Sequence, residues 1–136
     1  MNNTTGPRHE YTGASILLVY QDFPTASLLA ELLRLDHWTI HGPVQSEEVA
    51  TLMAKRDTPS AALLDADLGG AVIYPVADVL TRQGIPFMFV SSTGMRDLPP
   101  QFMRIPSVRK PFKYSQVWQV LATLAEAPPG TRYLNL

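Results

Sequence analysis

The chain of 136 residues suits one domain with one hydrophobic core, and its 46% apolar content is ordinary for a globular protein. A formal net charge of -1 gives no excess of positive charge that would attract nucleic acid or an anionic membrane. The absence of cysteine excludes disulfides and thiolate chemistry. No apolar run approaches the roughly 18 residues of a membrane span, and the N-terminal stretch lacks the apolar core of a signal peptide. We therefore expect a cytoplasmic protein with no nucleic-acid or membrane partner.

Strand and helix signals alternate along the chain. In chain order they are a strand over 15–20, a helix over 26–35, a strand over 38–42, a helix over 46–57, a strand over 61–65, a helix in the second half of 71–84, strands over 85–92 and 107–110, and a helix over 114–127. Ser46 is a predicted N-cap for the second of these helices. The stretch 93–106 contains three prolines and no helical period, so we expect it to be mostly irregular.

This alternation predicts an α/β fold in which parallel strands carry helices on both faces. Right-handed crossovers leave few topologies, and the flavodoxin-like strand order 2-1-3-4-5 is the leading one. We expect the domain to span 15–126, with a flexible N-terminal segment over 1–14 and a C-terminal tail over 127–136. In such sheets, binding sites form at the carboxyl ends of the strands.

Polar residues stand at four of those predicted strand ends. They are Gln21 or Asp22 after the first strand, Asp65 after the third, Ser91 and Ser92 after the fourth, and Lys110 after the fifth. Each has an ordinary explanation when taken singly, as a turn residue, a loop hydroxyl or a solvated lysine. Taken together, they would bring a carboxylate, hydroxyls and an ammonium into one pocket.

The segments that carry these residues are "LLD", "VSS" and "RKPF", and with them residues 15–125 resemble the CheY-like receiver domain of bacterial two-component response regulators. "LLDADLGG" is similar to the phosphoacceptor segment of that family, and "RKPF" to its lysine–proline signature. The run "LPPQFMRIPSVRKPF" resembles a subgroup in which the fourth helix is shortened.

The resemblance implies a role for each matching residue. Asp65 would be the phosphoacceptor, attacking a phosphohistidine on a histidine kinase or a histidine phosphotransfer protein. Ser91 would hydrogen-bond the phosphoryl group, and Lys110 would pair with it as a point charge. The Lys110–Pro111 peptide bond would be cis. Asp67 would offer its backbone carbonyl to Mg²⁺. Such a site suits phosphoryl transfer, which depends mainly on positioning and charge neutralisation.

Two departures from the family pattern matter. An adjacent acidic pair normally follows the first strand and holds the metal, whereas here an ungapped register places Tyr20 and Gln21 there, and a register shifted by one places Gln21 and Asp22. At least one carboxylate is missing in either register, so we expect Mg²⁺ to bind weakly or not at all, and we assign no metal ligand. In the fifth strand Ser107 stands where the family often has an aromatic switch residue.

The sequence thus favours a single-domain response regulator that is not an enzyme and signals by contact with a downstream protein. The alternative is a pseudo-receiver, a binding module that keeps the fold and works without phosphorylation because its acidic metal site is degenerate. A small flavodoxin-like enzyme is a third hypothesis, for which no nucleophile–histidine pair or nucleotide motif gives support.

Overall fold

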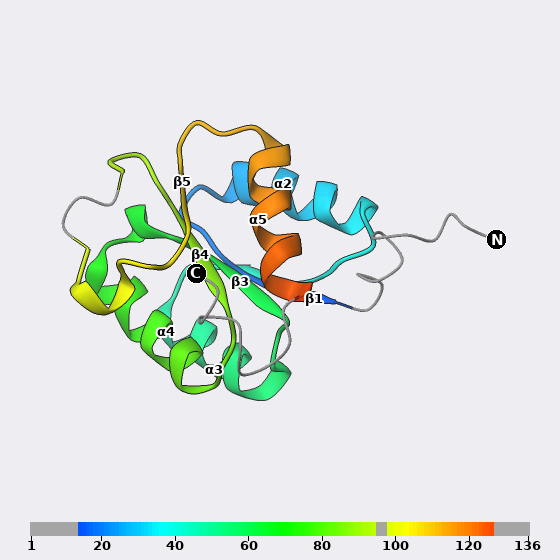
Figure 1. Ribbon diagram of the computed structural model, residues 1–136. Helices are drawn as coiled ribbons and strands as arrows, with labels where there is room; N and C mark the ends of the chain where they lie inside the picture. The colour runs from blue at the N-terminus through cyan, green and yellow to red at the C-terminus, as the bar shows by residue number, and fades with distance from the viewer. Residues whose placement is uncertain (1–13, 95–97, 127–136) are drawn as a thin grey trace.

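A computed structural model describes residues 14–94 and 98–126 (Figure 1). The five strands found in these residues are all parallel and follow the order β2-β1-β3-β4-β5, which confirms the predicted flavodoxin-like sheet. The strands are β1 (Ser15–Val19), β2 (Thr39–Val44), β3 (Ala61–Asp65), β4 (Phe87–Ser91) and β5 (Ser107–Arg109). The predicted C-terminal tail over 127–136, and all but the last residue of the predicted N-terminal segment over 1–14, lie outside the described residues.

Helices of the described residues cover both faces of the sheet (Figure 1). On one face lie α2 (Phe23–Leu35) and α5 (Tyr114–Glu126), and on the other lie α3 (Glu47–Asp57) and α4 (Gly70–Arg82). Ser46 caps α3 as expected, because its hydroxyl accepts a hydrogen bond from the Val49 amide at 3.1 Å. None of the helices in the described part of the chain has the length and apolar character needed to cross a bilayer.

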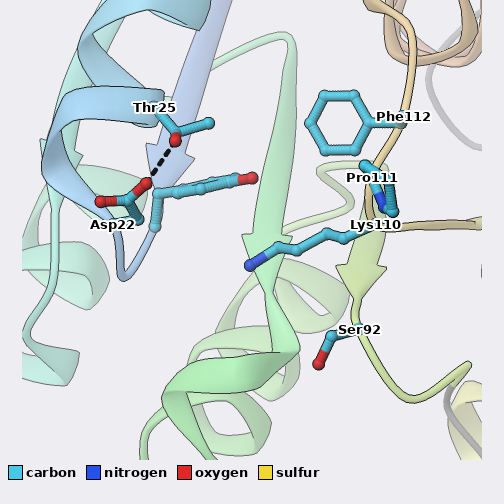
Figure 2. Close-up of a pocket in the computed structure, with 7 residues that line it drawn as sticks. Asp22, Thr25, Ser92, Lys110, Pro111 and Phe112 are labelled. Atoms are coloured by element: carbon cyan, nitrogen blue, oxygen red, sulfur yellow. Dashed lines mark hydrogen bonds between the residues drawn. The ribbon is translucent and has the colours of Figure 1, made fainter.

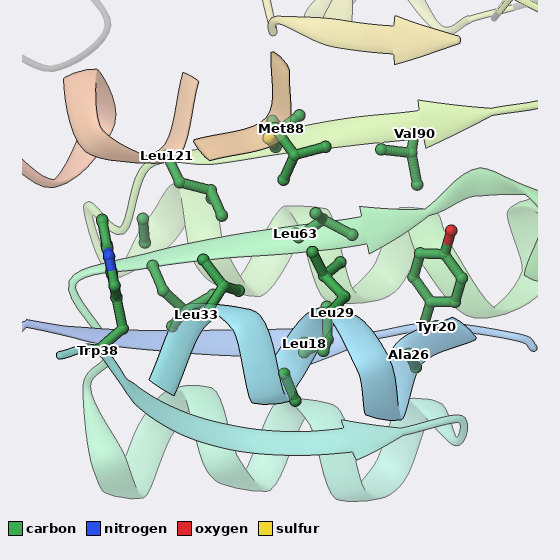
Figure 3. Close-up of a cluster of buried hydrophobic side chains, with 14 of the residues drawn as sticks. Leu18, Tyr20, Ala26, Leu29, Leu33, Trp38, Leu63, Met88, Val90 and Leu121 are labelled. Atoms are coloured by element: carbon green, nitrogen blue, oxygen red, sulfur yellow. The ribbon is translucent and has the colours of Figure 1, made fainter. Parts of the chain in front are cut away.

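Each face of the sheet builds its own hydrophobic core. Figure 3 shows the core under α2 and α5, where Leu18, Leu63 and Met88 from three strands meet Leu33 and Leu121 from the helices. On the opposite face, alternate residues of the same strands pack against α3 and α4. Because both faces are covered, β1, β3 and β4 are nearly continuous apolar runs that end abruptly in polar residues.

Two helices extend further toward their N-termini than the sequence predicted. The first predicted helix begins at Phe23 rather than Ala26, since Pro24 is well tolerated in a first turn. The helix expected only in the second half of 71–84 begins at Gly70 and runs through Pro75. A proline removes one helical hydrogen bond, and the burial of Ile73 and other apolar residues of α4 against the sheet outweighs that loss.

Strand β2 runs two residues past its predicted end at Gly42. Its pairing with β1 slips between Leu17 and Val19, so that Val19 lies opposite Val44. Gly42 makes this slip possible, because it has a φ of +113° and a Cβ there would lie 2.6 Å from the Leu18 carbonyl oxygen. The Val44 carbonyl then accepts the Tyr20 amide at 3.0 Å and fixes the backbone just beyond β1.

The connection between β4 and β5 contains no α-helix in its described residues, in agreement with the predicted shortened helix. A single turn, η2 (Pro100–Phe102), takes its place and buries Phe102 against the α4 side of the sheet. The Phe102 ring lies 5.9 Å from that of Phe89 and 6.3 Å from that of Phe87, in edge-to-face arrangements. This aromatic cluster anchors the connection without a regular helix.

Candidate functional site

Asp65 is the last residue of β3 and lies at the centre of the carboxyl edge of the sheet. Its side chain has no exposed surface, and three donors point at its carboxylate. The Gln21 amide donates to Oδ2 at 2.9 Å, while the Asp67 amide at 3.0 Å and the Lys110 ammonium at 2.8 Å donate to Oδ1. A buried carboxylate satisfied in this way is held in one orientation.

Lys110 follows β5 and reaches across the end of the sheet to Asp65. The Lys110 amide donates to the Ser91 carbonyl at 2.9 Å, and the Lys110–Pro111 bond is cis, as the resemblance implied. Burial alone would lower the pKa of Lys110, but hydrogen bonds to Asp65 and Asp67 outweigh burial and hold the pKa above its ordinary value. Lys110 is therefore a fixed positive charge at the site.

Asp67 lies in the short turn η1 (Ala66–Leu68), which brings its carboxylate back over the end of β3. It accepts the Lys110 ammonium at 3.0 Å, the Ser92 hydroxyl at 3.1 Å and the Ser92 amide, which lies 3.3 Å from both carboxylate oxygens. Burial acts to raise the pKa of Asp67, and the hydrogen bonds from Lys110 and Ser92 overcome it, so the pKa lies below its ordinary value.

Tyr20 and Gln21, rather than Asp22, make the contacts from the end of β1. The Tyr20 ring is 2% exposed, and the Lys110 ammonium lies 4.6 Å from its centre. Burial is the main reason that the pKa of the Tyr20 phenol is raised, so the group is neutral at pH 7. Asp22 precedes α2, and its carboxylate accepts a hydrogen bond from the Thr25 hydroxyl instead (Figure 2).

A cavity of about 440 Å³ opens beside this cluster (Figure 2). Its walls combine aromatic and apolar surface with hydroxyls and the Lys110 side chain, and the residues are Tyr20, Asp22, Thr25, Ser92, Lys110, Pro111 and Phe112. Asp65 lies behind Lys110 and contributes no wall, which agrees with its complete burial. A reactant in the cavity would therefore lie against Lys110 and Ser92 rather than against Asp65.

The structure brings Asp65 and Lys110 into direct contact, whereas Ser91 is turned elsewhere. The Ser91 hydroxyl is 3.0 Å from the Thr93 hydroxyl and accepts the Thr93 amide at 3.0 Å, and in the described part of the chain it makes no hydrogen bond to Asp65 or Lys110. The neighbouring Ser92 instead contacts Asp67. Sequence reasoning missed the Asp67 side chain, although an acidic residue two positions beyond a strand-terminal Asp is a usable signal for a turn that folds back.

The donor set at this edge does not fit Mg²⁺. The ion prefers six oxygen ligands in octahedral geometry, and carboxylates usually supply the protein's share. Asp65 and Asp67 are both paired with Lys110, Tyr20 is a neutral phenol, and the Gln21 carbonyl accepts the Gln45 side-chain amide at 2.5 Å. Within the described residues, no group of three or more His, Cys, Asp or Glu side chains could hold a metal ion.

Comparison by sequence gives no family model and no curated protein that matches this chain. Comparison by structure gives many matches. The solution structure of the BeF3-activated conformation of SdrG from Pseudomonas melonis Fr1 is 30% identical, with a TM-score of 0.67, and the alignment covers 83% of this chain and 99% of SdrG.

Two other solved structures are similar at lower identity. The receiver domain of the response regulator PhyR from Erythrobacter litoralis is 21% identical over 88% of this chain and 97% of its own, with a TM-score of 0.72. The receiver domain of the sensor histidine kinase PA1611 from Pseudomonas aeruginosa PAO1, which holds a magnesium ion in its active-site cleft, is 20% identical over 85% of this chain and 100% of its own, with a TM-score of 0.73. With the strand order and the acidic and basic residues at the strand ends, these matches show that the chain belongs to the response regulator receiver domains.

Proposed function

We propose that this receiver domain accepts a phosphoryl group on Asp65 from a histidine kinase or a histidine phosphotransfer protein, and that it signals in the cytoplasm by contact with a downstream protein. The observation that carries the proposal is the Asp65 carboxylate, held by two backbone amides and the Lys110 ammonium at the central strand end. SdrG, at 30% identity, has a BeF3-activated conformation, which supports activation of this chain by a phosphoryl-type ligand.

The reaction needs only one nucleophile from this chain. A carboxylate oxygen of Asp65 forms a bond to phosphorus while the phosphorus–nitrogen bond of the phosphohistidine breaks, and the electron pair stays on the imidazole nitrogen. The product is an acyl phosphate on Asp65. Lys110 would neutralise the negative charge on the transferring oxygens, and Ser92, as the hydroxyl at the cavity wall, would donate to them in the place that the resemblance gave to Ser91.

Binding of Mg²⁺ is weak or absent in this proposal, because Tyr20 and Gln21, and no carboxylate, make the contacts to Lys110 and Asp65 from the end of β1. When a divalent ion is present in a receiver, it neutralises charge on the phosphoryl oxygens. Here Lys110 would be the main cation available for that role.

The second candidate is the pseudo-receiver, and one observation favours it. Asp65 has no exposed side-chain surface, and its carboxylate is paired with Lys110, which also binds Asp67. If these contacts persist in solution, a phosphodonor does not reach the acceptor and the module works through its surface alone.

Incubation with acetyl phosphate or a cognate kinase, followed by Phos-tag electrophoresis and intact-mass measurement, separates the two candidates. A response regulator gives an acid-labile adduct in the wild type and in Asp78→Asn, a control on α4, and none in Asp65→Asn. Absence of the adduct in the wild type at high Mg²⁺, with a well-folded protein, rejects the phosphoacceptor role and supports the pseudo-receiver.

A further inference from the structure

The Asp67 carboxylate is surrounded by the groups that would bind a phosphate oxygen. One side of it faces the Lys110 ammonium at 3.0 Å, and the other faces the hydroxyl and amide of Ser92 at 3.1 and 3.3 Å. A cation, a hydroxyl and a backbone amide that converge on the two oxygens of one carboxylate form an oxyanion site. The side chain that fills this site belongs to the protein itself.

Asp67 is also linked to Asp65 through Lys110. The single Lys110 ammonium bridges the two carboxylates, at 2.8 Å from Asp65 and 3.0 Å from Asp67, so the cluster of three side chains keeps one excess negative charge. A phosphate-class anion that approached would meet this charge, and it would find two of the three Lys110 N–H donors and both the amide and the hydroxyl of Ser92 engaged by carboxylates. The complete burial of Asp65 agrees with such a closed arrangement.

We propose that Asp67 is an internal occupant of an oxyanion site formed by Lys110 and Ser92, and that it excludes phosphate and phosphoryl groups from Asp65 until it is displaced. The exclusion of free phosphate stands on the geometry of the cluster, whereas its consequence for Asp65 phosphorylation rests on the proposed function. The ligand class is a tetrahedral oxyanion, whose paired oxygens can take over the hydrogen bonds that the two Asp67 oxygens now accept.

Titration of ¹⁵N-labelled protein with inorganic phosphate, followed at the Ser92 amide by NMR, tests the site directly. In Asp67→Ala the Ser92 amide should shift in a saturable manner, with affinity at least about tenfold above that of the wild type. Asp67→Asn, which keeps the shape and removes the charge, should change in the same direction by less, and it serves if the alanine variant does not fold.

Two controls test whether the higher phosphate affinity of Asp67→Ala comes from the loss of the Asp67 carboxylate. Glu31→Gln removes one negative charge from an exposed position on α2 and should leave phosphate binding as in the wild type. Asp67→Ala combined with Lys110→Gln should lose the gain, because the cation is gone. Wild-type phosphate binding as tight as that of Asp67→Ala, or no gain in either Asp67 variant, overturns the proposal.

Acetyl phosphate then connects the site to Asp65. If Asp65 is a phosphoacceptor, Asp67→Ala should form the adduct at least about tenfold faster than the wild type. A gain in phosphate binding without any adduct leaves the oxyanion site standing and rejects the phosphoacceptor role. If wild type and Asp67→Ala form the adduct at equal rates and the variant shows no gain in phosphate binding, the role of Asp67 as an internal occupant is rejected. The phosphoacceptor role of Asp65 is then kept.

Discussion

The Lys110 ammonium lies 4.6 Å from the centre of the Tyr20 ring, so an aromatic face stands against this cation at the end of β1. A carboxylate at that position would instead supply a hard oxygen ligand beside Asp65 and Asp67. The aromatic face attracts the ammonium but is not an oxygen ligand for a divalent metal. We therefore expect the residue at position 20 to affect how well the site binds a divalent metal.

Tyr20→Asp should strengthen the binding of a divalent metal at this edge of the sheet. A unit charge about 4 Å from a divalent ion contributes roughly 8 kcal/mol gross at an effective dielectric near 20, before desolvation is subtracted. We expect the variant to bind Mn²⁺ in the millimolar range or tighter, measured by the loss of the free-ion EPR signal, with circular dichroism confirming the fold. Tyr20→Phe, which keeps the ring, should bind no more than the wild type, and millimolar-or-tighter binding by the wild type would contradict the prediction.

Lys110→Met should destabilise the protein by about 2–4 kcal/mol. Asp65 is fully buried and would keep only two backbone donors. Breaking a buried ion pair typically costs about 3–5 kcal/mol. Because 20% of the Lys110 side chain is exposed, we expect a smaller loss of stability than for a fully buried pair. Urea denaturation measures the change. The exposed Lys113→Met should stay within about 0.5 kcal/mol, and adding Asp65→Asn to Lys110→Met should recover part of the loss. Equal stabilities of Lys110→Met and wild type would mean that Asp65 does not need this partner.

The strand order and the meeting of Asp65 with Lys110 could be predicted because they depend on chain connectivity. Parallel strands joined by right-handed crossovers place every carboxyl end at the same edge, so the final residue of each apolar run marks the site. The directions of the polar side chains beyond the strands could not be predicted. They depend on turn geometry, as when the Asp65 side chain caps η1 and turns Asp67 toward Lys110.

The start of the helix over Gly70–Arg82 and the end of β2 were missed for a different reason. Pro75 argues locally against a helix, and Gly42 followed by Pro43 argues locally against a strand. Tertiary packing overrides both signals, since α4 buries its apolar residues against the sheet and β2 gains its last pair with β1. Local propensity gives the wrong boundary where long-range contacts supply the larger free energy.

Phe102→Ala should cost about 3–5 kcal/mol, as is typical for loss of a buried aromatic ring. The ring is 2% exposed and packs within 5.7 to 6.3 Å of the Tyr74, Phe87 and Phe89 rings, which anchors the connection that replaces a helix. Met103→Ala removes a neighbouring side chain that is 72% exposed and should change stability by less than about 0.5 kcal/mol. Similar small losses for both variants in urea denaturation would show that the connection does not depend on this cluster.

The stability of the wild type should fall more steeply at acid pH than that of Asp67→Asn. The pKa of Asp67 is lowered in the folded protein, despite burial, by hydrogen bonds from Lys110 and Ser92. The contribution of the Asp67 carboxylate to the free energy of unfolding is therefore complete above the unfolded-state pKa of about 3.9. It is lost as the pH falls through the folded-state pKa, because the unfolded chain binds more protons than the folded protein in that range.

Urea denaturation at a series of pH values from about 5 downward measures this difference. The free energy of unfolding of Asp67→Asn should be lower than that of the wild type at pH 5, because the charged hydrogen bonds to Lys110 and Ser92 are weakened. The two curves should converge as the pH falls below about 4, since the wild type then loses the same interactions by protonation. Parallel curves across this range would show that the Asp67 carboxylate gains no net free energy from Lys110 and Ser92, and would leave its position over Asp65 without an electrostatic cause.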